Sequence, residues 1–163
     1  ANAGPDKNGN QLSLKHRVCD ILEEQSALPS LLLTLLVSLE TPSIVTQNYD
    51  QLTEQAVANQ NIAEQERLRS RDEQRIPKTL SVFPHKPVKG ASQWLLHMHG
   101  CTSHPERIVL TKQDYDQRKD ILGGLVQANL MTAHLLFCGF SLTDPNYLRI
   151  VQEVREAINP PSS

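Results

Sequence analysis

Three polar side chains that follow apolar runs could together carry out proton-transfer chemistry: Asn48, Asp50 and His99. An imidazole titrates near neutral pH, so His99 is suited to act as a general base. Asn48 offers both a hydrogen-bond donor and an acceptor, which suits holding a water or a hydroxyl group in place. The carboxylate of Asp50 can accept a hydrogen bond or stabilise positive charge. These residue types predict a site that positions and deprotonates a hydroxyl group.

A purely structural role competes with this interpretation. A histidine at the end of a strand is more often packed or hydrogen-bonded than catalytic. Alternation along the run Trp94–Met98 places His97 and His99 on the same face, so the pattern alone does not separate these two histidines. Four other histidines have no comparable context: His16, His85, His104 and His134.

A strand followed by a helix must position Asn48 and Asp50. The β-branched run Ile44–Thr46, bounded by Pro42, predicts a buried strand, and helical spacing follows from Leu52. The two polar residues therefore lie at the carboxyl end of a strand. In open α/β sheets ligands bind there, because the next helix presents unpaired amides and the strand ends leave a crevice.

Two more turns downstream have the same construction. An apolar run ends at His99 and Gly100, and a second ends at Gly139 and Ser141, with Thr143 or Asp144 as the helix cap and Pro145 as the first helical residue. We therefore predict an α/β fold: a Rossmann-like parallel sheet with helices on both faces. Its strands lie near 43–47, 93–98 and 135–139, and their carboxyl ends face one crevice.

The remaining segments complete this fold. Apolar residues recur at helical intervals over 12–24, and a second helix, which begins near Pro29, is apolar nearly all round, so we expect it to be buried. The helix from Tyr49 extends to about Ile62, and 64–78 is a solvated segment of mixed charge. Further strands are expected at 79–83 and 108–110. A cap made by Thr111 and Asp114 precedes a helix over 115–128, which Gly123 and Gly124 interrupt.

The length, net charge and cysteine content of the chain argue against several classes of protein. A chain of 163 residues with 39% hydrophobic content suits one packed domain, which we expect over 12–158 after a flexible segment at 1–11. A net charge of -2 gives no basic surface for nucleic acid or an anionic membrane. Three cysteines without a C-x-x-C pair predict neither a disulfide framework nor a structural zinc site. We expect a soluble protein in the reducing cytoplasm.

The three turns resemble the successive motifs of sirtuin-like domains. The matching segments are Thr46–Asp50, His99–Gly100 and Gly139–Pro145, in the family's order. Ile108–Thr111, with Asp114–Tyr115, also resembles the branch of sirtuin-like NAD hydrolases, which includes antiphage effectors and eukaryotic relatives. The resemblance covers about Ser43 to Ile158.

This resemblance implies that the chain is an NAD glycohydrolase, with NAD as its substrate and no metal. It assigns catalysis to Asn48, His99 and Asp50. It assigns cofactor binding to Thr46, Gln47, Gly139, Ser141 and Asp144.

Two departures from the family leave alternatives open. The zinc module of sirtuin deacylases has no counterpart between His99 and Gly139, which makes an NAD-dependent protein deacylase the less favoured function. No glycine-rich loop for the diphosphate precedes Ser43, so we expect a domain incomplete on its amino-terminal side, with weak binding of NAD. We then expect an exposed sheet edge that associates with a second copy or a partner segment. A non-catalytic nucleotide-binding or self-assembly module is the remaining alternative.

Overall fold

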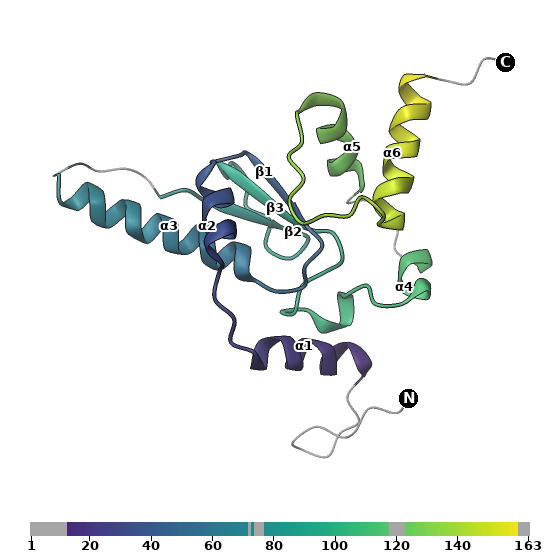
Figure 1. Cartoon of the computed structure of the whole chain (residues 1–163), viewed down its shortest axis with the longest axis horizontal. Coiled ribbons are helices and arrows are strands. Elements are labelled where there is room, and N and C mark those ends of the chain that lie inside the picture. Colours follow the sequence, from purple (N-terminus) through teal and green to yellow (C-terminus); the bar gives the residue numbers. More distant parts are fainter. Residues whose placement is uncertain (1–12, 72, 74–76, 118–122, 160–163) are drawn as a thin grey trace. The chain divides into compact units, whose positions relative to one another are not determined.

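The computed structural model describes residues 13–71, 73, 77–117 and 123–159 (Figure 1). The chain forms two compact units, residues 1–110 and 111–163, and each is treated by itself below. The flexible segment predicted at 1–11 lies outside the described residues.

The first unit is built on a three-stranded parallel sheet, in the order β1-β3-β2. The strands are β1 (Ser43–Thr46), β2 (Leu80–Phe83) and β3 (Gln93–His97). β1 and β2 both pair with the central β3, and Thr46 is the partner of His97 in the register. Parallel strands align their carboxyl ends, so the residues after β1 and β3 emerge at the same edge. The predicted Rossmann-like α/β fold with a parallel sheet is confirmed.

Two helices, α2 (Leu31–Ser38) and α3 (Leu52–Arg69), pack together on the sheet. Val37 of α2 meets Ala56 and Val57 of α3 in a buried cluster, against which Ile44 of β1 and Leu80 of β2 also pack. Helical spacing places Ala56 and Val57 on the side of α3 that faces inward. This cluster orients the start of α3, and therefore the turn between β1 and α3. α3 ends at Arg69, later than the predicted end near Ile62.

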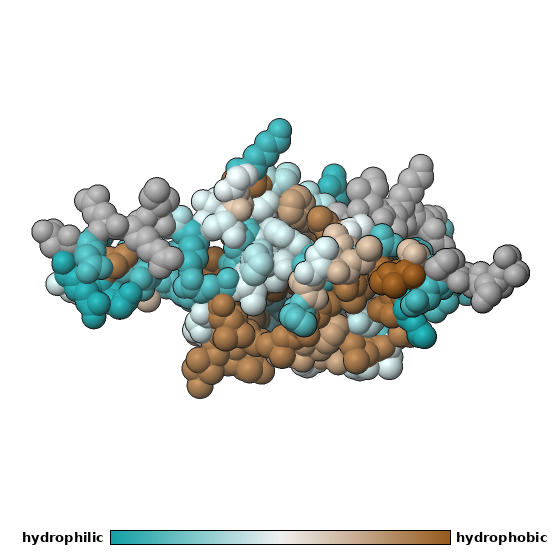
Figure 2. All heavy atoms as spheres, turned by 90° about the horizontal axis from the view of Figure 1, so that it is seen from above, coloured by the Kyte–Doolittle hydropathy of each residue, from teal (hydrophilic) through white to brown (hydrophobic). Residues whose placement is uncertain are grey.

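α2 is apolar nearly all round, as its sequence shows, but the prediction that it is therefore buried is wrong. Only Val37 is buried, whereas Leu31 is 75% exposed and Leu32 61%. The reason is that α2 is only eight residues long and packs through one side against α3. Figure 2 shows apolar side chains, in brown, gathered along one side of this view. Other exposed apolar residues of the first unit are Leu14, Ile21, Leu28, Leu35, Leu39, Val45, Ile62 and Val88.

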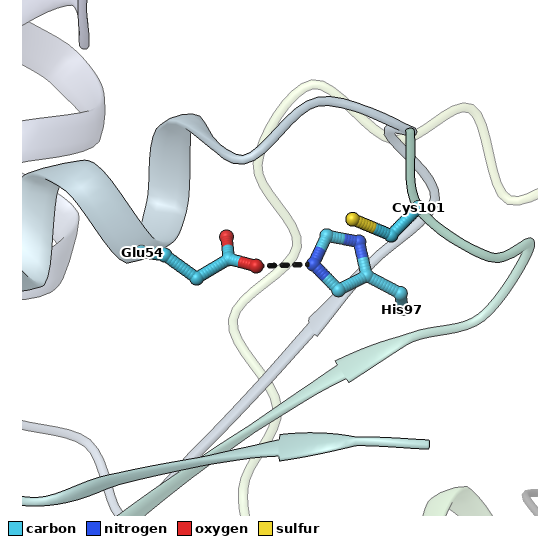
Figure 3. Close-up of side chains that lie close together, drawn as sticks. All are labelled: Glu54, His97 and Cys101. Carbon is cyan, nitrogen blue, oxygen red and sulfur yellow. Dashed lines mark hydrogen bonds and ion pairs between the residues drawn. The ribbon is translucent and has the colours of Figure 1, made fainter. Parts of the chain in front are cut away.

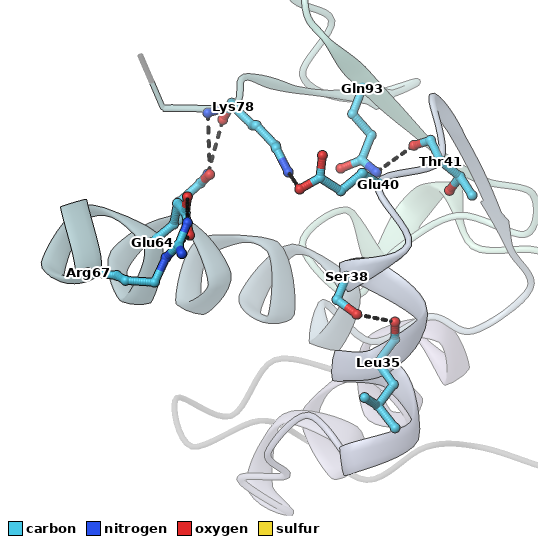
Figure 4. Close-up of polar contacts among 9 residues, drawn as sticks. Leu35, Ser38, Glu40, Thr41, Glu64, Arg67, Lys78 and Gln93 are labelled. Atoms are coloured by element: carbon cyan, nitrogen blue, oxygen red, sulfur yellow. Dashed lines mark hydrogen bonds and ion pairs between the residues drawn. The ribbon is translucent and has the colours of Figure 1, made fainter. Parts of the chain in front are cut away.

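Polar contacts hold the amino-terminal ends of the three strands in place (Figure 4). The side-chain amide of Gln93 donates to the carbonyl of Thr41 at 2.7 Å, and Lys78 pairs with Glu40. The amide side chain of Asn61 in α3 bonds both the backbone N–H and the carbonyl of Lys78. A small cavity of about 40 Å³ lies between α3 and this region and is lined by none of the predicted site residues.

The helix predicted over 12–24 is α1 (Leu14–Glu24), which Ser13 caps. α1 contacts the short 3-10 helix η1 (Pro105–Arg107), and Cys19 is buried. Burial raises the pKa of the Cys19 thiol to about 11, so this cysteine stays protonated at neutral pH. None of the described helices is both long and apolar enough to cross a membrane.

The second unit contains α4 (Lys112–Gln117), α5 (Gly123–Thr132) and α6 (Pro145–Ile158). The predicted cap of α4 is confirmed: Thr111 N–H donates to Asp114 and Asp114 N–H donates back to Thr111 Oγ1. α5 begins at the glycine pair that was expected to interrupt a single helix, and residues 118–122 lie outside the described part.

Two predicted strands are not formed. Residues 108–110 form no strand, although Val109 N–H donates to His99 O at 2.9 Å and Val109 O accepts from the hydroxyl of Tyr49. Residues 135–139 lie in no sheet, and Leu136 is 70% exposed. An apolar run becomes a strand only when another strand satisfies its backbone groups, and no described residue pairs with 135–139 in that way. The third strand of the sheet is β2 instead.

Candidate functional site

The turn after β1 is held by its own polar side chains. Thr46 Oγ1 accepts a hydrogen bond from Asn48 N–H at 3.1 Å, and Asp50 Oδ1 accepts one from Leu52 N–H at 3.0 Å. The second bond satisfies an amide that would otherwise be unpaired at the start of α3. Asn48 is exposed. The turn therefore fixes the backbone of Asn48 and leaves its side chain accessible.

Hydrogen bonds join this turn to the segment after β3. Met98 N–H donates to Thr46 O at 2.9 Å, and Thr102 N–H donates to Tyr49 O at 2.8 Å. The hydroxyl of Tyr49 donates to Val109 O at 2.6 Å. Segments 47–50 and 99–102 consequently lie side by side at the carboxyl edge of the sheet. Asn48 and His99 are thus brought into neighbouring segments, as the position of each after a strand predicted.

Gly100 allows the chain to turn directly after His99. Its φ is +86°, and a Cβ at this position would lie 2.8 Å from Arg107 O and 2.9 Å from Ile108 Cα. Only glycine fits both the dihedral angle and the space. His99 itself is 5% exposed, and its carbonyl accepts from Val109 N–H. The backbone on both sides of His99 is therefore fixed.

His97 has an environment of its own, shown in Figure 3. Its side chain is fully buried; Nδ1 lies 3.2 Å from Asn48 O, and Nε2 lies 2.9 Å from Oε1 of Glu54 in α3. Burial lowers the pKa of His97, but the hydrogen bond and charge of Glu54 outweigh it, so the pKa is raised above its ordinary value. His97 is therefore an internal link between β3, the turn and α3.

One group of side chains has the donor types of a metal site. Glu54, His97 and Cys101 each place a potential ligand atom within 4.8 Å of the others, and such a set suits zinc. However, a metal binds the lone pair of an imidazole nitrogen, and each nitrogen of His97 faces an oxygen acceptor here. When Glu54 is ionised, both nitrogens of His97 donate in this arrangement, and His97 and Glu54 then form an ion pair beside the thiol of Cys101.

Gln47, predicted to bind the cofactor, differs from the other residues of the turn. Its side-chain nitrogen Nε2 is buried and has no hydrogen-bond partner among the described residues. A buried amide with an unsatisfied donor is costly, and such groups often occur where a ligand completes the hydrogen bond. The described contacts of Thr46 and Asp50, by contrast, stabilise the turn.

The other predicted binding residues lie in the second unit. Gly139 has a φ of +63°, and Ser141 Oγ lies 2.7 Å from Thr143 Oγ1. Asp144 caps α6 by accepting from Tyr147 N–H at 2.9 Å, with Pro145 as the first helical residue, as predicted. Three aromatic rings pack around this turn with centroids 5.2 to 5.8 Å apart: Phe137, Phe140 and Tyr147.

A comparison with protein families shows to which family the chain belongs. The model of the SIR2-like domain matches residues 42–163, which include all three predicted turns. The chain belongs to the SIR2-like domain family. Its sirtuin-like relationship, predicted from the motifs, is confirmed.

Curated relatives point to one branch of the SIR2-like family. The chain is 32% identical over 127 residues to the NAD(+) hydrolase ThsA of Bacillus cereus, an alignment that covers 76% of this chain and 24% of the relative. It is 30% identical over 124 residues to the NAD(+) hydrolase ThsA of Acinetobacter baumannii, covering 74% and 23%. The chain thus spans about a quarter of the length of these relatives. The predicted kinship with sirtuin-like NAD hydrolases is confirmed.

Sequence reasoning missed three residues that shape this SIR2-like site: Tyr49, Glu54 and Cys101. Glu54 lies in the first turn of α3, where an acidic residue is common because it complements the helix dipole, so its type gave no special signal. Tyr49 lies inside the recognised motif, but its partner Val109 is 60 residues away. These contacts depend on the tertiary fold and could not be read from local spacing.

Proposed function

We propose that this chain carries the catalytic turn segments of an NAD glycohydrolase, which cleaves the bond between nicotinamide and ribose. The observation that supports the proposal is that segments 47–50 and 99–102, which contain the exposed Asn48 and the buried His99, are neighbours in a SIR2-like domain. The names of the ThsA relatives support NAD as the substrate.

Cleavage of this bond does not require the protein to supply a general acid. When the C–N bond breaks, its electron pair stays on the nicotinamide nitrogen, which leaves as a neutral ring, so no acid is required. Water forms the new C–O bond at an oxocarbenium-like carbon and gives its proton to His99, yielding nicotinamide and ADP-ribose. Asn48 holds the attacking water or a ribose hydroxyl, using its amide as donor and acceptor. The carboxylate of Asp50 stabilises developing positive charge.

The remaining predicted residues are proposed to bind the substrate. Gln47 offers the buried amide donor described above, and Thr46 supports it from the same turn. Gly139, Ser141 and Asp144 are proposed to contribute from the turn before α6, where Ser141 presents a hydroxyl group.

The decisive experiment is incubation of the purified chain with NAD, with release of nicotinamide measured by chromatography. A deacylase releases nicotinamide only with an acylated peptide, whereas a glycohydrolase releases it without one. A non-catalytic nucleotide-binding module releases none in either case. Release that is independent of peptide and lost in the His99→Ala variant supports the proposal.

Association with a further strand is part of the same proposal. β1 is an edge strand of the described sheet, and its Val45 is 42% exposed. An exposed parallel edge offers backbone groups to another chain. We propose that a second copy or a partner segment pairs there, and that the chain by itself binds NAD weakly, because helix-start amides of a glycine-rich loop supply much of a dinucleotide's affinity.

Calorimetric titration of NAD, combined with the mass in solution by light scattering, tests this part. Weak binding by an assembly supports it. Tight binding by a monomer contradicts it, since the site would then be complete without any partner.

A further inference from the structure

The backbone carbonyl of Asn48 and the carboxylate of Glu54 lie on opposite sides of one buried ring, that of His97. A carbonyl oxygen has no hydrogen to donate, so Nδ1 of His97 must be the donor at 3.2 Å. An ionised carboxylate only accepts, so with Glu54 charged Nε2 is the donor at 2.9 Å. A ring that donates from both nitrogens is an imidazolium.

We infer that His97 acts as a positioning residue: as an imidazolium it ties Asn48 O to Glu54 and thereby fixes the backbone from which the side chain of Asn48 projects. This inference rests on the proposed function, because it concerns the residue proposed to hold the attacking water.

The surrounding contacts show why this bond matters to Asn48. Thr46 Oγ1 holds the N–H of Asn48, and His97 holds its carbonyl, so the two peptide groups that flank the Cα of residue 48 are both fixed. The Asn48 side chain is exposed. With the backbone fixed on both sides, the direction of the Cα–Cβ bond is set, and only the side-chain rotamer remains free. Fixing a reacting group in advance lowers the entropic cost of the reaction.

Two carboxylates favour the imidazolium, and one thiol lies close to it. Glu54 contributes its carboxylate from α3, and Asp50 contributes negative charge from the turn. Cys101, from the segment after β3, places its thiol within 4.8 Å of the other two ligand-type atoms. Burial of His97 opposes the charge, but the direct partner Glu54 compensates for it.

Two substitutions separate the two hydrogen bonds of His97. The side-chain nitrogen of His97→Asn occupies the place of Nδ1 and retains the bond to Asn48 O, whereas that of His97→Gln occupies the place of Nε2 and retains the bond to Glu54. Each variant loses one bond of the ring. Asparagine is one methylene smaller than glutamine and leaves the larger void at this buried position, so the loss of stability is measured separately for each variant.

We expect His97→Asn to keep most of the nicotinamide release and His97→Gln to lose about tenfold to a hundredfold in kcat, the range caused by small misplacement of a reacting group. Rates are expressed per folded molecule, with the folded fraction taken from circular dichroism. Equal rates in the two variants overturn the inference, because a purely structural histidine would affect both alike.

Nitrogen NMR of the wild-type ring provides a readout that needs no activity. We expect both nitrogens of His97 to be protonated at pH 7. The backbone N–H of Tyr49 belongs to the same peptide group as Asn48 O, and we expect its NMR signal to be sharper in His97→Asn than in His97→Gln. A neutral ring, or one equivalent of zinc in the purified chain by elemental analysis, overturns the inference. If the wild type releases no nicotinamide, the proposed function fails, while these spectra still decide whether His97 holds residue 48.

Discussion

The turn after β1 and the turn before α6 follow the same sequence logic but have different structures. Each has an apolar run, a polar turn, and an aspartate whose side chain accepts from a backbone N–H at the start of a helix: Asp50 from Leu52 and Asp144 from Tyr147. The first run is β1, paired with β3 over Ser43–Thr46, whereas residues 135–139 before the second turn form no strand.

The difference shows what each kind of contact contributes. Both aspartates act within three residues along the chain, so each helix start forms whatever surrounds it. The turn after β1 is in addition held from outside by Thr102 N–H and by His97. Ser141 Oγ contacts Thr143 Oγ1 within its own turn, and Asp144 accepts from Tyr147 N–H in α6. A turn that is to place a reacting group needs the long-range contacts, and the turn after β1 has them.

The largest difference between the turns is expected in catalysis. His99→Ala and Asn48→Ala should each reduce nicotinamide release by about a hundredfold or more, because proton transfer and water positioning are lost. Ser141→Ala should cost less than about tenfold, as expected for a secondary binding group. His99→Ala keeps the backbone bond from Val109 N–H to His99 O, so circular dichroism should show an intact fold. A larger loss in Ser141→Ala than in Asn48→Ala would reverse the assignment of the two turns.

Glycine substitutions should separate the two turns by stability. Gly100→Ala places a Cβ 2.8 Å from Arg107 O at a φ of +86°, and we expect it to lose about 3 kcal/mol of unfolding free energy. Gly139→Ala has a φ of +63° but no heavy atom within 4 Å of its Cβ, so it should lose about 1 kcal/mol. Urea denaturation of both variants measures the two losses. Equal losses would show that the crowding around Gly100 relaxes easily.

The same contrast explains how far the sequence predicts the structure. The cap at Thr111 with Asp114 was predicted correctly, and the structure selects Asp144 of the two predicted candidates, Thr143 and Asp144; in both caps the partners lie within three residues. The strands at 43–46 and 93–97 were found from their apolar pattern and their position before polar turns. The same pattern failed at 135–139, because an apolar run does not reveal whether a partner strand exists.

Within the site, the sequence located the turns but not the links between them. His97 and His99 could not be separated by alternation, and the contact that distinguishes His97 reaches Glu54, which is 43 residues away. The family motif selected His99 because Gly100 follows it, and the structure supplies the reason that Gly100 is required. Distant pairs of this kind become visible only once the sheet has brought their segments together.

Removal of each helix-start aspartate should have a smaller and similar effect in the two turns. Asp50→Ala and Asp144→Ala should each lose about 1 kcal/mol of unfolding free energy, the usual value for such side chains. Asp50→Asn keeps the oxygen acceptor for Leu52 N–H and should be almost as stable as the wild type. Its nicotinamide release should nevertheless fall if the carboxylate acts on positive charge in the reaction. Full activity in a stable Asp50→Asn variant would leave Asp50 with a structural role only.

The smallest expected effect is a pH dependence of stability that originates at His97. Because the pKa of His97 is raised in the folded chain, the folded state holds more protons than the unfolded state between the ordinary pKa and the raised one. Its contribution is therefore fully present below about pH 6.5, the ordinary value for histidine, and is lost as the pH rises through the raised pKa. The unfolding free energy of the wild type should fall over this window.

The variant Glu54→Gln is the control for this pH dependence. It removes the charge of Glu54, and a neutral ring can still donate to Asn48 O while it accepts from the new amide, so the unfolding free energy should change less steeply with pH. Cys19 titrates near 11 and does not enter this window. The other histidines contribute equally to both proteins, so the difference between the two urea-unfolding curves across pH isolates the ion pair of His97 and Glu54, and identical slopes would show that this pair does not titrate with folding.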